Sequence, residues 1–339
     1  MSEVLSAEVK ASRRSIGVFL LAGLALGIVV AFPFVASPYA LRVGILIAYY
    51  AYLGQAWNIL GGYTGQFSFG HAAFFGLGAY TSSLLFAKLG VTPWIGMLAG
   101  AVAAATMGAF IGLLCFRYGL RGPYFSLATL AFAEILRVIA LNWRAVGGAM
   151  GVLLPLRESF WAMQFPEGPP YYAIIMTMLA GITMLTYLLE QSRVGAYFVA
   201  IRESEDAAEA IGVDTMRYKV LAMALSSGLT ALGGTFYAQY FSYIDPNLAF
   251  GIDVSVAVLL PVIIGGVGTL FGPIAGSLIL TPLGEVTRRL LGGYRGVHLM
   301  LFGAILVAVI LFLPHGIAGA IQERQRIGRR FSHDPPRSS

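Results

Sequence analysis

Charge is concentrated in one stretch of this chain, RESEDAAEAIGVDTMRYK, which covers residues 202–219. Eight of its eighteen residues are charged, whereas charged residues make up only 11% of the whole sequence. Ser204 is a residue type that caps helices, and the carboxylates of Glu205 and Asp206 favour the positive end of a helix dipole. The stretch therefore predicts a short helix of about two turns over 205–211.

This short helix needs a surface to pack on, because a helix of two turns is marginal in water by itself. Gly212 is a natural terminator, and Asp214 can cap the helix that follows. Two interpretations stay open: a solvated turn that keeps its loop outside the membrane, or a helix that docks into a groove. The apolar residues available for docking are small ones and one isoleucine: Ala207, Ala208, Ala210 and Ile211.

A second stretch, GGYTGQFSFGHAAFFG at residues 61–76, combines five glycines with polar side chains between two apolar segments. Each glycine disfavours uninterrupted helix by roughly 1 kcal/mol. Broken helix at membrane depth is tolerated where the freed backbone faces protein or a wet cavity, which makes this stretch a candidate translocation path. The alternative is that the glycines let helices approach closely, with His71 as a hydrogen-bonded packing residue. The candidate path residues here are Gly65, Gln66, Ser68, Phe69, Gly70 and His71.

Glu134 and Arg137 lie three positions apart within another apolar segment, so they share one face of a helix. A charge at the centre of a bilayer costs about 2.5–3.5 kcal/mol on insertion scales, and such residues usually pair or face a cavity. Glu134 is accordingly either half of a structural ion pair or a polar contact on the translocation path.

Signatures of catalysis are missing from the sequence. A phosphate-binding loop needs Gly-Lys-Ser/Thr, and no lysine here follows a glycine. The four histidines form no HExxH motif, and no GxSxG sequence encloses a serine. The single cysteine, Cys115, excludes a disulfide within the chain. We expect no catalytic residue, no metal site and no cofactor in this chain.

Membrane helices must position these residues. The sequence is 58% hydrophobic and has a mean hydropathy of +0.78, and its charged fraction is well below the roughly 25% of soluble domains. About 20 apolar residues suffice to cross the hydrocarbon core. The predicted fold is an all-α polytopic membrane protein with about ten transmembrane helices, some broken or re-entrant. The expected spans are 16–36, 41–60, 67–87, 93–115, 123–141, 171–189, 219–240, 252–266, 268–283 and 297–313.

The distribution of lysine and arginine predicts that both termini lie in the cytoplasm. In that orientation fourteen basic residues fall in inside loops and tails, against seven outside. The net charge of +6 is then explained by the inside rule, and no nucleic-acid partner is expected. The segment 16–34 is interpreted as a retained helix rather than a signal peptide. The expected organisation is a cytoplasmic segment 1–15, a membrane domain 16–320 with an external loop 142–170 and a cytoplasmic loop 190–218, and a basic tail 321–339 near anionic lipid.

Several motifs resemble one transporter family. DAAEAIG matches the acidic-Ala-Ala-x-x-x-Gly pattern of permease subunits of ABC importers, and the longer SRVGAYFVAIRESEDAAEAIGVDTMRYKVLA resembles the branched-chain amino acid permease family, close to its LivM-type member. GGYTGQFSFGHAAFFGLGAYTS, RGPYFSLATLAFAEILR, LLPVIIGGVGTLFGPIAGSLIL and LFLPHGIAG are similar to segments of the same family. The resemblance covers about residues 41–320. Ala196 departs from it, since the family often has arginine there.

The resemblance implies a multi-pass permease of the bacterial inner membrane that works by alternating access. Its expected partners are two cytoplasmic ABC ATPase subunits, which would carry ATP and Mg, a homologous LivH-type permease subunit, and a periplasmic substrate-binding protein. The expected substrates are branched-chain amino acids, with urea, short amides or aromatic acids as alternatives. Residues at about 205–212 would form the coupling helix that contacts the ATPase. The implied coupling residues are Arg202, Glu203, Glu205, Asp206, Ala207, Ala208, Glu209 and Gly212.

Two other functions compete with this one. A proton-coupled secondary transporter could use Glu134, Asp245 or Asp253, but it would leave the short charged helix without a role. A non-transporting membrane scaffold would account for that helix but not for the glycine-broken spans. The importer accounts for both features.

Overall fold

A computed structural model describes residues 27, 30–291, 300 and 303 of the chain. The predicted span 16–36 is described only in part, and the predicted span 297–313 only at two positions. The segment 1–15 and the tail 321–339 lie outside the described residues.

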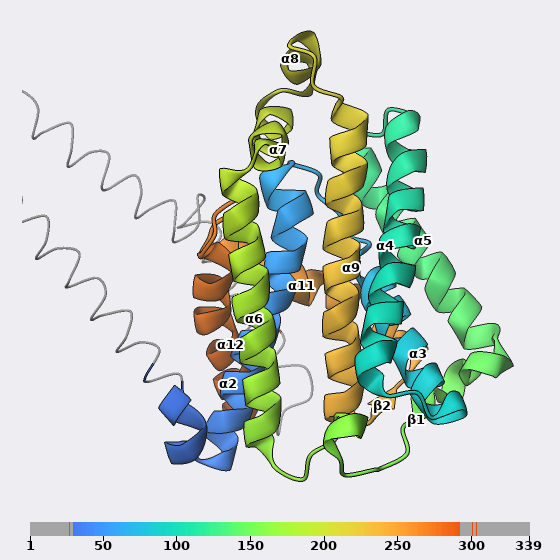
Figure 1. The fold of residues 1–339 in the computed structure, drawn as a ribbon, viewed down its shortest axis with the longest axis vertical. Helices are drawn as coiled ribbons and strands as arrows, with labels where there is room; N and C mark the ends of the chain where they lie inside the picture. The colour runs from blue at the N-terminus through green and yellow to red at the C-terminus, as the bar shows by residue number, and fades with distance from the viewer. Residues whose placement is uncertain (1–26, 28–29, 292–299, 301–302, 304–339) are drawn as a thin grey trace, which may run out of the picture.

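The described chain is a bundle of long helices, most of whose axes run close to one direction, while α5 is strongly tilted (Figure 1). Within the part of the chain that the structure describes, seven helical segments are long and apolar enough to cross a membrane, and the protein is a multi-pass membrane protein of the all-α class. Proline in the first turn starts several of these helices, where its missing amide costs no hydrogen bond. The seven segments are Pro38–Tyr63 (α2 with one π-helical turn, η1), His71–Leu89 (α3), Pro93–Arg117 (α4), Pro123–Asn142 (α5), Gly168–Gln191 (α6), Thr215–Phe241 (α9) and Pro246–Gly265 (α10 and α11).

These helices confirm the predicted spans between 41 and 266 to within a few residues at most ends. The segment predicted as a span at 268–283 overlaps α12, Gly272–Leu291, which packs along α2 and is not among these seven segments. Ser277 donates a hydrogen bond to the Ile47 carbonyl (2.6 Å), and the Arg289 guanidinium lies 5.1 Å from the ring centroid of Tyr39 in the first turn of α2. The total of ten spans and the orientation of the bundle stay predictions.

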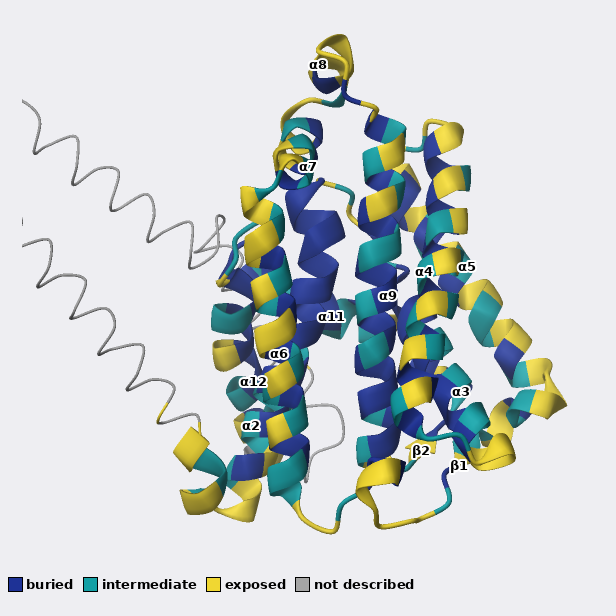
Figure 2. Ribbon diagram, in the orientation of Figure 1, coloured by how far each residue is buried: buried dark blue, intermediate teal, exposed yellow. Residues whose placement is uncertain are grey.

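The core of the bundle is built around α2, α3 and α9, whose residues are the most buried (Figure 2). Helix α9 packs closely on α3 because small residues face each other. A Cβ atom on Gly78 would lie 2.1 Å from the Ala231 carbonyl oxygen, and one on Gly234 would lie 2.1 Å from the Phe75 carbonyl oxygen. Such contacts leave no room for side chains and fix the two helices at their closest approach.

The bundle has two distinct ends. One carries α7 (Arg193–Glu203) and α8 (Glu205–Ala210), and α8 projects beyond the long helices; we refer to it as the α8 end (Figure 1). The opposite end holds the loop predicted as external, 142–170. This loop contains three 3-10 turns, Arg144–Val146, Gly148–Met150 and Phe160–Ala162, and strand β1, Val152–Leu153, which pairs with β2, Tyr243–Ile244, in antiparallel register.

Candidate functional site

Helix α8 confirms the short helix predicted over 205–211, one residue shorter at its end. The Ser204 backbone is extended, which separates α8 from α7, and its hydroxyl accepts a hydrogen bond from the Ala207 amide (3.3 Å). Gly212 follows with a φ of +88°, a conformation that favours glycine. Asp214 then caps α9 by accepting from the Arg217 amide (3.0 Å). The capping pattern in the sequence therefore sets the local fold.

A buried ion pair holds α8 on α9. The Lys219 ammonium binds the Glu205 carboxylate, and the side chains are only 4% and 13% exposed. Arg121, in the turn before α5, contacts the same carboxylate (3.3 Å) and that of Asp206 (3.1 Å). The hydrogen bond to Asp206 and the charge of Glu205 raise the pKa of the Arg121 guanidinium above its usual value. Two basic residues outside the predicted coupling set thus anchor this helix.

Apolar packing adds to this anchor. Ala208 is buried in a small cluster with Ile201 of α7 and Val213, and the rings of Tyr197 and Tyr218 close the cluster with their centroids 4.8 Å apart. The sequence predicted that this short helix needs a surface to pack on. Residues of the same chain provide that surface for its inner face.

The outer face of α8 is open. Asp206 has 81% of its side chain exposed, Ile211 is 77% exposed, and Ala207 and Ala210 are also exposed. Six of the eight predicted coupling residues have side-chain contacts within the chain. Glu205 and Ala208 face inward, and Glu209 accepts a hydrogen bond from Thr215 (2.5 Å). Arg202 reaches the bundle and pairs with Glu203, and Asp206 pairs with Arg121. Glu203, Asp206, Ala207 and Gly212 remain exposed on the surface.

Arg202 extends from the last turn of α7 to the end of α2. Its guanidinium donates from Nη1 to the Gly62 carbonyl (3.2 Å) and pairs with Glu203 through Nη2 (2.9 Å). Gly62 belongs to the π-helical turn η1, Ile59–Tyr63, where the helix ends and its carbonyls lack helical partners. A cation at a helix C-terminus is favourable, so this contact has a clear electrostatic cause.

Two non-helical segments meet beneath Arg202. The first, 64–70, joins η1 to α3, and the second, 266–271, joins α11 (Ile252–Gly265) to α12. Asn58 holds the second segment on α2 by accepting from the Gly268 amide (2.8 Å) and donating to the Thr269 carbonyl (3.0 Å). A Cβ atom on Gly268 would lie 2.5 Å from Arg202 Nη1 and 2.8 Å from the Gly62 oxygen. Gly62 of the glycine-rich stretch 61–76 is therefore in contact with Gly268 of the motif LLPVIIGGVGTLFGPIAGSLIL.

The predicted path residues of the first segment are enclosed by neighbouring helices. The Trp57 indole donates to the Ser68 carbonyl (2.9 Å), Thr129 accepts from the Phe69 amide (3.2 Å), and the buried His71 ring is 2.8 Å from the Ser226 hydroxyl. These contacts fit the interpretation of His71 as a packing residue. Gly70 is buried, Phe69 and Gln66 are half-buried, and Gly65 is exposed.

Glu134 is paired rather than free. Its carboxylate accepts two hydrogen bonds from Arg137 (2.5 and 2.9 Å), and Arg137 also donates to Asn247 of α10, Pro246–Phe250 (2.7 Å). Glu134 keeps 55% of its side chain exposed on α5. The geometry fits a structural ion pair that joins α5 to α10. Among the described residues, no group of three or more His, Cys, Asp or Glu side chains could hold a metal ion.

Sequence reasoning missed Lys219 and Arg121 as anchors of α8. A signal was available for Lys219, since it is a lone ammonium at the start of an apolar span and so needs a partner. No such signal pointed to Arg121, which lies 84 residues before Glu205 in the sequence and meets it only in the folded chain.

Comparisons with known proteins agree with these motifs. The family model described as branched-chain amino acid transport system, permease component, matches residues 39–310. The high-affinity branched-chain amino acid transport system permease protein LivM of Escherichia coli is 27% identical over 88% of this chain and 74% of that protein. LivH of Escherichia coli is 27% identical over 80% of this chain and 91% of that protein. The autoinducer 2 import system permease protein LsrC of Klebsiella pneumoniae is 30% identical over 54% of this chain and 52% of that protein. No solved structure matches the chain.

Proposed function

This chain belongs to the permease component family of branched-chain amino acid transport systems, and from that membership we propose that it is the membrane subunit of an ATP-driven importer. Its substrates are branched-chain amino acids, and it resides in a bacterial inner membrane with the α8 end in the cytoplasm. It pairs with a LivH-type permease subunit, receives substrate from a periplasmic binding protein and rests on two ATPase subunits. The similarity to both LivM and LivH supports the pairing of two related permeases.

The observation that carries this proposal is the two-sided character of α8. A helix of six residues has little stability of its own, yet this one is fixed from inside by a buried ion pair and a buried alanine. Its outer face is left exposed and projects beyond the bundle (Figure 1). A short helix with a fixed inner face and an open outer face is suited to bind a second protein and pass its movement to the membrane helices.

In the proposed mechanism, the ATPase pair grips α8 and moves it when ATP binds and is hydrolysed. Lys219 passes that movement to α9, and Arg202 passes it to the two non-helical segments, 64–70 and 266–271. Broken helices can change direction at their breaks more easily than continuous ones. The bundle then opens alternately toward each side of the membrane. This chain binds no ATP or Mg itself, and both belong to the partner subunits.

Co-purification with the ATPase subunits tests the docking role of α8. Ile211→Glu places a charge on the outer face and should release the ATPase, because Ile211 makes little contact with its own chain. Tyr118→Glu is the matched control, since Tyr118 lies in the turn after α4 and is also 77% exposed. Retention of the ATPase by the Ile211 variant would show that α8 is not the docking element. Substitution of Glu205 or Glu209 would be less informative, because both bind their own chain.

Uptake into proteoliposomes that contain the whole assembly tests the energy source. We expect leucine uptake to require ATP and to continue in the presence of a proton ionophore. Uptake that proceeds without the ATPase subunits and stops with the ionophore would instead establish a proton-coupled transporter. The ion pair of Glu134 with Arg137 gives that alternative no support.

A further inference from the structure

A cavity of about 660 Å³ opens at the end of the bundle opposite α8. It lies between the first turns of α2, the loop that precedes α6, and the last turn of α9. Its volume is in the range of sites for small molecules, which is about 300–1,000 Å³. Aliphatic and aromatic side chains form most of its wall, including Leu41, Ile45, Phe165, Tyr171 and Tyr240.

Two opposite charges line this cavity beside its apolar side chains, Arg42 on α2 and Glu167 at the start of α6. Within the described residues neither side chain takes part in an ion pair. Glu167 occupies the N-cap position of α6, yet its carboxylate caps no backbone amide. The guanidinium and the carboxylate are therefore both available to a ligand.

The wall of the cavity is held in place by contacts that leave these charges unused. The Gln164 side chain accepts from the Arg157 amide (2.7 Å), and the Phe165 amide donates to the Tyr171 hydroxyl (3.2 Å). A Cβ atom on Gly168 would lie 2.8 Å from Leu41 Cδ2, so the loop is in close contact with α2. The backbone around Arg42 and Glu167 is therefore held in place without using either charged group.

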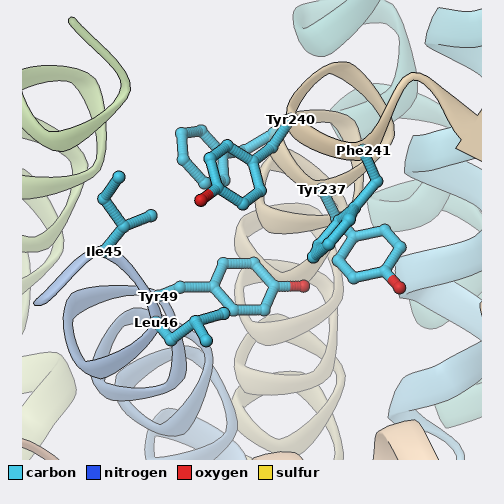
Figure 3. Close-up of a pocket in the computed structure, with 7 residues that line it drawn as sticks. Ile45, Leu46, Tyr49, Tyr237, Tyr240 and Phe241 are labelled. Atoms are coloured by element: carbon cyan, nitrogen blue, oxygen red, sulfur yellow. The ribbon is translucent and has the colours of Figure 1, made fainter. Parts of the chain in front are cut away.

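A second, much smaller space of about 10 Å³ lies along α2 and α9 among aromatic side chains (Figure 3). Ile45 and Tyr240 line both spaces. Beyond them the ring of Tyr49 extends from α2 toward α9, with its centroid 6.0 Å from that of Phe236 and 6.1 Å from that of Tyr237. Ile45 and Tyr240 therefore place an apolar, aromatic cluster next to the cavity that Arg42 and Glu167 line.

We propose that this cavity receives an α-amino acid with an apolar side chain, a proposal that rests on the function proposed above. Arg42 binds the substrate carboxylate, for which its forked guanidinium is suited, and Glu167 binds the substrate ammonium. The aliphatic and aromatic wall takes the side chain. These two ion pairs offset the free-energy cost of removing water from the charged groups of the substrate.

Binding of three probes to the purified permease in lipid nanodiscs tests the site directly. The probes are L-leucine, 4-methylpentanoate, which lacks the ammonium, and 3-methylbutylamine, which lacks the carboxylate. Wild-type protein should bind leucine more tightly than either analogue. Arg42→Gln should weaken leucine and 4-methylpentanoate by about tenfold and leave 3-methylbutylamine unchanged, while Glu167→Gln should weaken leucine and the amine and leave 4-methylpentanoate unchanged. Arg42→Lys should restore part of the carboxylate binding.

Arg157→Gln and Glu158→Gln are matched controls, because they make the same charge changes in the loop at this end without lining the cavity. If these controls weaken leucine as much as the cavity variants, or if neither cavity variant separates the two analogues, the site is wrong. Uptake by the assembled transporter keeps this outcome distinct from failure of the proposed function. ATP-dependent leucine uptake with unchanged KM in both cavity variants refutes the site alone, whereas absence of ATP-dependent uptake in the wild-type assembly refutes the importer.

Discussion

Removal of the negative charge at Glu205 should loosen α8 far more than removal of the neighbouring charge at Asp206. The Lys219 side chain is 4% exposed, so Glu205→Gln leaves a buried ammonium without its carboxylate. Breaking one partner of a buried pair costs about 3–5 kcal/mol. The Phe116 ring, whose centroid is 4.8 Å from the ammonium, offsets about 1 kcal/mol of this cost. The remaining destabilisation of about 2–4 kcal/mol corresponds to roughly 30-fold to several-hundred-fold in the opening equilibrium.

Amide hydrogen exchange of the detergent-solubilised protein measures this opening at the positions that matter. The Ala208 amide donates to the Ser204 carbonyl (3.0 Å) and the Val213 amide to the Ala208 carbonyl (3.0 Å), so both report on α8. Glu205→Gln should raise their exchange rates by about 30-fold or more, up to the rate of an unprotected amide. Asp206→Asn is the matched control, because its side chain is 81% exposed and its surface ion pair with Arg121 contributes little. Its effect should stay within about fivefold.

A double variant separates loss of the ion pair from loss of packing. Glu205→Leu combined with Lys219→Met replaces both charges by apolar side chains and leaves no unpaired ion. Exchange at the two reporter amides should return close to the wild-type rate. Equal exchange in Glu205→Gln and Asp206→Asn would refute the conclusion that the buried pair anchors α8.

Three further changes test the packing and the contacts beneath α8. Gly78→Val should lower the thermal unfolding temperature in detergent by several degrees, because the new side chain would meet the Ala231 carbonyl; Gly181→Val, where nothing lies within 4 Å, should leave it nearly unchanged. Asn58→Leu should increase proteolysis and amide exchange in 266–271, since the Gly268 amide and the Thr269 carbonyl lose their partner at a cost of about 1–3 kcal/mol each. Arg202→Met should keep the ATPase bound but lower leucine uptake per ATP hydrolysed, whereas unchanged coupling would remove Arg202 from the transmission path.

The spans could be predicted because their signals are local. Apolar length, proline in the first turn and glycine at the end act within a few residues, so the expected 93–115 became Pro93–Arg117. The start and end of α8 could also be predicted, because Ser204 and Gly212 act on the backbone within a few residues. The contacts of Lys219 could not be read from the sequence, because Glu205 lies fourteen positions away across the end of a helix. Arg42 and Glu167 are farther apart still and share a cavity only because α2 packs on α6.

The contacts below α8 explain why two glycine-rich segments far apart in the sequence occur in one protein. Each segment joins two consecutive helical elements, η1 at the end of α2 to α3 and α11 to α12. Gly62 and Gly268 can touch because the side chain of glycine is a single hydrogen atom. The Arg202 guanidinium lies against both residues. A displacement of α7 and α8 would therefore act on both helix pairs at their least helical points, while the buried pair of Lys219 and Glu205 makes α9 move with them. In the proposed mechanism, the glycines and the charged stretch are therefore parts of one arrangement, through which movement imposed on α8 would reach the helices that surround the core.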